Sequence, residues 1–202
     1  MTLPVLLDLA ELAATRAALH ATAERMAAEQ YAANTELALT ATEGGFATGW
    51  FPGDGDATVR LSVSGPDLVR ESGARVTRTP LDGVDPAAEA VLVAWWSLGS
   101  SVLSGLDAGA DAISPVILWP EHFDIAVTVT TPDGRGLNLG FSPGDDFSSQ
   151  PYVYAGPWEK QAGTFWNAPF GAVRTYSQVA VGDPAGTSAA FLADARSVFA
   201  AG

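Results

Sequence analysis

The pattern of apolar and polar residues at the start of the chain predicts a long helix. Over residues 8–33 an alanine-rich segment carries larger apolar side chains along one stripe, which is typical of an amphipathic helix. Asp8 and Glu11 have the spacing of a capping box, so the helix is expected to begin there. The residues of the apolar stripe are Leu9, Leu12, Leu19 and Met26.

A second stripe of this predicted helix is charged. Arg16, His20 and Glu24 follow one another at intervals of four residues, which places them on one face. Charged side chains usually stay at the surface of a protein. The stripe is therefore expected to form a solvated or half-buried ridge.

Strict alternation then replaces the helical period and predicts an antiparallel meander. Leu37, Leu39 and Ala41 alternate with polar or small residues, and the same alternation recurs over residues 58–63. Glycine and proline pairs supply turns between these segments. Asp85 followed by Pro86 then has the chemistry of a helix start, so a second helix is expected to about residue 106.

The second half of the chain repeats the order of helix and meander. Alternation over residues 123–130, 137–141, 151–156 and 172–179 predicts further strands, and residues 187–200 predict a closing helix. Together the elements predict an α+β fold, in which a long N-terminal, a central and a C-terminal helix pack against antiparallel β-sheets. We expect a single domain over residues 1–202. Two subdomains, 1–109 and 110–202, remain the alternative.

Composition narrows the class of protein. The chain has 202 residues, of which 48% are hydrophobic and 16% charged, so it can bury a sizeable core. Its 23 acidic and 10 basic residues give a net charge of −13, which argues against nucleic acid and anionic membranes as partners. Without cysteine or a basic segment before its first apolar residues, the chain is expected to be cytoplasmic.

Candidate chemistry begins with His122, one of only two histidines. If the strand starts near residue 122, His122 and Asp124 project from the same face while Phe123 enters the core. An imidazole beside a carboxylate can serve as an oriented general base or as two metal ligands. The alternative is a hydrogen-bonded pair that fixes the edge of a strand.

Two further groups of residues could complete a site. The segment Ser-Pro-Gly-Asp-Asp ends in Asp145 and Asp146, which could hold a divalent cation or ligand hydroxyls, or could be ordinary turn chemistry. Residues 119–176 contain eleven of the nineteen aromatic residues, which indicates either a ligand pocket or an aromatic core. The candidate ligand-binding residues are Trp119, Glu121, Asp146, Tyr152, Tyr154, Trp158, Trp166 and Asn167.

Four sequence blocks in the second half carry a resemblance. LWPEHFD (118–124), GFSPGDD (140–146), PYVYAGPW (151–158) and FWNAPFGA (165–172) resemble a family of proteins from high-GC bacteria that has no established activity. The first half resembles the same family in TRAALH (15–20) and GGFATGWF (44–51). A broader bacterial domain of unknown function is distantly similar. The resemblance implies that the blocks form one composite site, and it implies neither a reaction nor a cofactor.

Two functions follow from these residues. The first is an enzyme, a hydrolase or isomerase, in which His122 is a general base or metal ligand, Asp124 orients it, and Asp145 holds a metal ion or the substrate. A divalent metal could assist such an enzyme, and acid–base catalysis by the carboxylates without a metal is the alternative. The sequence contains no nucleotide-binding motif. The second is a binding protein without turnover, whose aromatic blocks form a ligand cradle or a homodimer interface. Either would favour a small neutral or cationic polar ligand over an anion.

Overall fold

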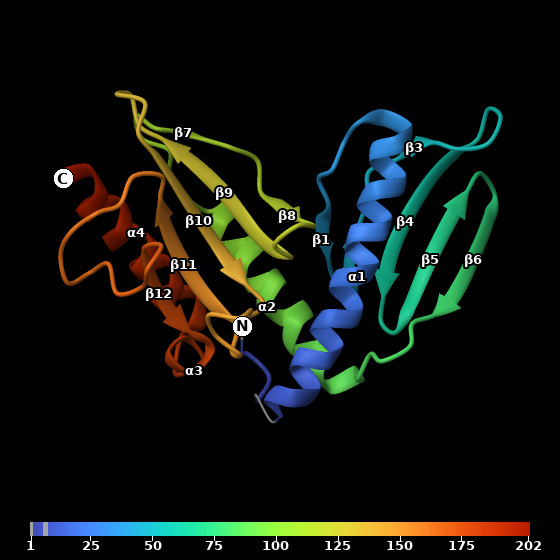
Figure 1. Cartoon of the computed structure of the whole chain (residues 1–202), viewed down its shortest axis with the longest axis horizontal. Coiled ribbons are helices and arrows are strands. Elements are labelled where there is room, and N and C mark those ends of the chain that lie inside the picture. Colours follow the sequence, from blue (N-terminus) through green and yellow to red (C-terminus); the bar gives the residue numbers. More distant parts are fainter. Residues whose placement is uncertain (1, 6–7) are drawn as a thin grey trace.

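The computed structural model describes residues 2–5 and 8–202, and it confirms the α+β fold with two antiparallel sheets (Figure 1). The N-terminal sheet has the strand order β1-β2-β4-β5-β6, and β3 also pairs with β4. Its strands are β1 (Thr40–Thr42), β2 (Gly45–Ala47), β3 (Phe51–Pro52), β4 (Thr58–Ser64), β5 (Asp67–Ser72) and β6 (Arg75–Pro80).

The second antiparallel sheet, the C-terminal sheet, has the strand order β12-β11-β10-β9-β7, and β8 also pairs with β9. Its strands are β7 (Ala112–Ile113), β8 (Ile117–Trp119), β9 (Asp124–Thr130), β10 (Gly136–Ser142), β11 (Tyr152–Pro157) and β12 (Ala172–Thr175). Leu39 and Leu118 join the two sheets through a pair of backbone hydrogen bonds of 3.1 and 2.9 Å.

The long helices begin where the sequence predicts them. The Asp8 carboxylate accepts hydrogen bonds from the first backbone N–H groups of α1 (Leu9–Asn34), and Asp85 does the same for α2 (Pro86–Ser104). The predicted closing helix is α4 (Pro184–Ala201), which begins three residues before the expected start at residue 187.

The strand predicted over residues 172–179 is four residues longer than the observed strand β12. It ends at Thr175, and α3 (Tyr176–Val179) follows. The Gln178 side chain accepts a hydrogen bond of 2.9 Å from the Thr175 N–H. This contact belongs to a capping box, which starts a helix at Tyr176. Alternation of apolar residues alone does not reveal such a stop.

Helix α2 connects the two halves of the core. Trp95 packs against Phe141 of β10, and Trp96 packs against Phe46 of β2. Gly99 permits this close approach, because a Cβ atom there would lie 2.8 Å from the Phe141 ring. Among the described residues, α2 is the helix with the length and apolarity of a membrane-spanning helix. Many of its apolar side chains are buried in this core.

Helices α2 and α4 pack on the same face of the C-terminal sheet and form a layer behind its strands in Figure 1. Leu137, Leu139 and Phe141 of β10 point into that layer and are fully buried. We call the opposite surface of this sheet its open face, formed by alternate residues of β9, β10 and β11. Helix α1 borders the open face at one end.

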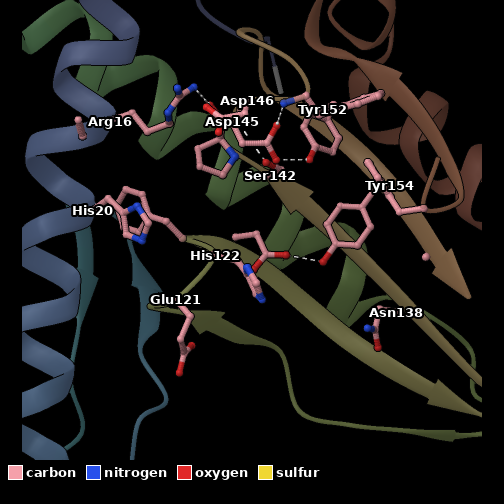
Figure 2. Close-up of a pocket in the computed structure, with 18 of the residues that line it drawn as sticks. Arg16, His20, Glu121, His122, Asn138, Ser142, Asp145, Asp146, Tyr152 and Tyr154 are labelled. Carbon is pink, nitrogen blue, oxygen red and sulfur yellow. Dashed lines mark hydrogen bonds between the residues drawn. The ribbon is translucent and has the colours of Figure 1, made fainter. Parts of the chain in front are cut away.

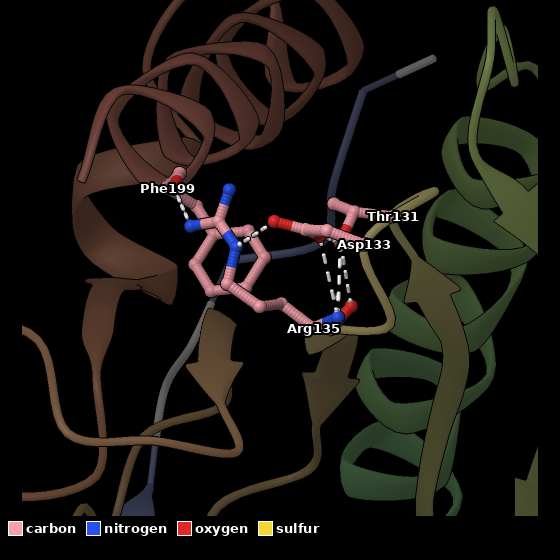
Figure 3. Close-up of polar contacts among 4 residues, drawn as sticks. All are labelled: Thr131, Asp133, Arg135 and Phe199. Carbon is pink, nitrogen blue, oxygen red and sulfur yellow. Dashed lines mark hydrogen bonds and ion pairs between the residues drawn. The ribbon is translucent and has the colours of Figure 1, made fainter.

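The turn between β9 and β10 is fastened to the end of α4 by one arginine (Figure 3). The Arg135 guanidinium donates to the Phe199 carbonyl oxygen at 2.8 Å and lies 4.9 Å from the centre of the Phe199 ring. It also donates to the Asp133 carboxylate at 2.9 Å. With the Thr131 hydroxyl, this contact lowers the pKa of Asp133. Arg135 therefore stabilises the C-terminal end of the helix, where carbonyl groups lack intrahelical partners.

We predict that Arg135→Met lowers the free energy of unfolding by about 1 kcal/mol, because it removes a hydrogen bond to a helix end and a cation–π contact at a partly exposed site. Denaturant unfolding of the variant measures the change. Arg75→Met, on an exposed strand, is the matched control and should change stability by less than about 0.5 kcal/mol. Equal effects of the two substitutions would contradict this role.

Candidate functional site

Small residues on β10 make room for aromatic rings on the open face. Gly140 pairs with Tyr154 of β11, and an added Cβ atom at Gly140 would lie 2.7 Å from the tyrosine ring. A Cβ atom at Gly136 would lie 2.2 Å from the ring of Trp158. Both rings therefore lie flat over the backbone of β10, and they form a platform that any larger residue at these positions would disrupt.

The open face is the floor of a cleft of about 990 Å³ (Figure 2). Three regions of the chain meet there: α1 on one side, the turn between β8 and β9, and the loop after β10. Of the eleven residues predicted for the site, eight line the cleft. They are Glu121, His122, Asp124, Asp145, Asp146, Tyr152, Tyr154 and Trp158.

The backbone at His122 differs from the predicted strand. Residues 120–123 form a turn, Phe123 has a positive φ of 56°, and β9 begins only at Asp124. The reason is the close contact between the Phe123 N–H and the Trp119 carbonyl oxygen at 2.7 Å, which curls the chain after Pro120. His122 is consequently exposed on the turn, and no hydrogen bond joins it to Asp124 in the described structure. Phe123 enters the core as predicted.

Asp124 is the buried carboxylate of the cleft, with 6% of its surface exposed. Its Oδ2 atom accepts a hydrogen bond from the Tyr154 hydroxyl, whereas its Oδ1 atom has no partner among the described residues. Burial raises the pKa of Asp124, and the contacts with Tyr154 and His122 oppose this only in part. The pKa of Tyr154 is also raised, first by burial and then by the Asp124 charge.

Asp145 differs from Asp124, because both of its carboxylate oxygens accept hydrogen bonds from neighbouring residues. Oδ1 accepts from the N–H groups of Phe147 and Ser148 at 2.8 and 3.1 Å, and Oδ2 accepts from the Tyr152 hydroxyl at 2.6 Å. Burial and this last bond raise the pKa of Tyr152. Asp145 thus orders the loop that carries the exposed Asp146 at the rim of the cleft.

Helix α1 contributes Arg16 and His20, which the sequence analysis assigned to a solvated or half-buried ridge and which are half-buried. The His20 ring stacks on Phe123 at 5.1 Å, and its Nε2 atom lies 2.8 Å from the Pro120 carbonyl oxygen. Since a carbonyl can only accept, Nε2 carries the proton. Arg16 donates to the Pro143 carbonyl oxygen at 3.4 Å. Their spacing on one helix face was the available signal, but it did not show which segment they would meet.

Three predicted site residues lie outside the cleft. Trp119 is 39% exposed at the end of β8. Trp166 lines a second hollow of about 460 Å³, which adjoins the cleft at Trp158 and Phe170. The Asn167 side chain forms hydrogen bonds of 2.8 and 3.2 Å with the backbone of Val173. Four further lining residues were not among the candidate site residues: Asn138, Ser142, Phe147 and Phe170. Ser142 and Phe170 lie in the sequence blocks expected to form a composite site, and Phe147 is one of the clustered aromatic residues, whereas Asn138 had no sequence signal.

The charge of the cleft selects among ligands. Glu121, Asp124, Asp145 and Asp146 supply four carboxylates, and Arg16 is the single guanidinium in the lining. The excess of negative charge favours cations and neutral molecules over anions. In the described part of the chain, however, no three His, Asp or Glu side chains are grouped so that they could hold a metal ion.

We predict that Asp124→Asn becomes more stable relative to the wild type as the pH rises. An acid with a raised pKa in the folded state destabilises folding above its unfolded pKa, and this cost is absent below about pH 4, where both states are protonated. Thermal unfolding of both proteins, from below about pH 4 to neutral pH, measures the difference in their stabilities. Asp146→Asn, at an exposed position, is the control and should change stability by less than about 0.5 kcal/mol. A pH-independent effect of Asp124→Asn would contradict the prediction.

Comparisons with protein-family models, curated proteins and solved structures found no significant match to the chain. The family resemblance seen in the four sequence blocks therefore stays an expectation. Conclusions about function rest on the cleft itself.

Proposed function

We propose that the protein binds a small organic molecule in this cleft, and that Asp124 pairs with an ammonium group or another hydrogen-bond donor of the ligand. The observation that carries the proposal is the unpartnered Oδ1 atom of a carboxylate that is almost wholly buried. An unsatisfied buried acceptor is costly to a fold. A donor from a ligand would remove this cost.

Shielding from water strengthens the expected contact. Less than 1 Å² of the Oδ1 atom is accessible to solvent, so a ligand donor reaches this atom only when a neighbouring side chain of the cleft moves aside, and the contact then excludes water. A hydrogen bond between two charged partners in such an environment is stronger than one at the surface. The contact therefore favours an ammonium group over a neutral hydroxyl.

The aromatic walls support the same class of ligand. Phe147 packs edge-on against Tyr152 and Phe170, with ring centres 5.7 and 5.0 Å apart. Phe147 and Phe170 nevertheless remain 45% and 40% exposed, which leaves ring surface free beside the acidic floor. The face of an aromatic ring attracts a cation, and its apolar surface accommodates an attached hydrocarbon chain.

We predict that the wild-type protein binds n-alkylamines, and that Asp124→Asn weakens their binding about tenfold to a hundredfold, as expected for loss of a charge-assisted hydrogen bond. Isothermal titration calorimetry at pH 7 with hexylamine as the probe measures the affinity. Because the pKa of Asp124 is raised, wild-type affinity should fall as the pH is lowered towards that pKa, before an ordinary aspartate would titrate.

Asp56→Asn is the matched control, since Asp56 is exposed in the loop before β4 and is not among the residues that line the cleft. It should leave the affinity and its pH dependence unchanged. Equal binding of hexylamine by the wild type and Asp124→Asn, or absence of binding by the wild type, would overturn the proposal.

A second candidate function is acid–base catalysis by a hydrolase or isomerase, with His122 and Asp124 as the groups that transfer protons. Its support is a carboxylate with a raised pKa in a cleft, next to an imidazole that interacts with its charge. If this function holds, His122→Ala should abolish turnover of chromogenic ester or amide substrates but leave hexylamine binding intact. A cytoplasmic location and a homodimer stay predictions.

A further inference from the structure

We propose that the ligand is amphoteric, with an ammonium group at Asp124 and a carboxylate or carbonyl oxygen at Asn138, and that Asn138 determines specificity for this second group. The inference deepens the proposed function and rests on it. Asn138 lies on β10 in the floor of the cleft, apart from the acidic groups (Figure 2).

Two neighbours fix the orientation of the Asn138 amide. The Trp158 indole N–H donates to Oδ1 at 3.3 Å, and the Thr128 hydroxyl donates to the same atom at 2.9 Å. An indole nitrogen can only donate, so the atom that faces it must be the amide oxygen. The Asn138 NH₂ group is therefore turned away from both neighbours, and it has two donors available for a ligand.

The strand register sets the distance between the two polar ends. Asn138 pairs with Thr128 of β9, and Asp124 lies four residues earlier on that strand, which corresponds to a rise of about 13 Å. Gly140 and Tyr154 occupy the floor between them. An extended ligand could thus place a donor at Asp124 and an acceptor near Asn138, with its apolar middle over the Tyr154 ring.

The charged side chains around the cleft also differ between its Asp124 end and its Asn138 end. Glu121, Asp145 and Asp146 lie with Asp124 in the lining of the cleft. The second hollow adjoins the cleft at Trp158, whose indole contacts Asn138, and it contains Lys160, the only lysine in the chain. A negative group at the Asn138 end is therefore farther from the Asp124 carboxylate than one bound beside it.

The experiment compares ω-amino acids of increasing chain length with n-alkylamines of the same length, using calorimetry at pH 7. In the wild type the best ω-amino acid should bind about tenfold more tightly than the matching amine, because it gains hydrogen bonds to the amide. Asn138→Asp keeps the oxygen that accepts from Thr128 and Trp158 but removes both donors. It should abolish the tenfold gain and leave amine binding at least as tight.

Asn138→Ala removes the amide without adding a charge and should also abolish the gain, which separates the lost donors from simple repulsion. Asn34→Asp, at the end of α1, is the matched control and should retain it. If amines bind through Asp124 but ω-amino acids bind no better, the inference is overturned and the proposed function stands. Persistence of the gain in both Asn138 variants would also overturn it. If no probe binds, the proposed function fails together with the inference.

Discussion

Burial of the Phe123 ring is the constraint on which the cleft depends. The ring contacts His20 of α1, Phe46 of β2 and Trp96 of α2, and its residue has a positive φ. A left-handed backbone costs a non-glycine residue about 1–2 kcal/mol, and full burial of a phenylalanine contributes about as much or more. The aromatic contacts thus offset the strain of the turn. The residues on either side of this fixed ring, His122 and Asp124, line the cleft.

The two faces of the C-terminal sheet differ in composition, because one packs against the core and the other forms the floor of the cleft. One face packs against α2 and α4 and contains only apolar side chains on β10, and this layer supplies rigidity. The open face combines glycine, asparagine and serine on β10 with large rings on β11. Such a surface contributes little to folding, and at Asp124 it opposes folding, because burial raises the pKa of the carboxylate. A residue that lines a cleft and lowers the stability of the fold is typical of functional sites.

Much of the fold could be predicted because its signals are local. Alternation identified β4, β9 and β10, and the carboxylates of Asp8 and Asp85 marked the starts of two helices. The aromatic blocks also led to most of the residues that line the cleft. Sequence reasoning failed for the roles within it. Spacing predicted His122 beside Asp124 on a strand, whereas Tyr154, thirty residues farther along the chain, is the partner of Asp124.

The sequence by itself determined the class of fold, the acidic character and most of the segments that line the cleft, because composition and periodicity depend on neighbours along the chain. Only the tertiary structure decided which groups are free to act. Both oxygens of Asp145 accept hydrogen bonds near its loop, whereas one oxygen of Asp124 has no partner among the described residues. Arg16 and His20 of α1 line the same cleft. Hydrogen-bond satisfaction and burial depend on contacts between distant segments, and no pattern of spacing encodes them.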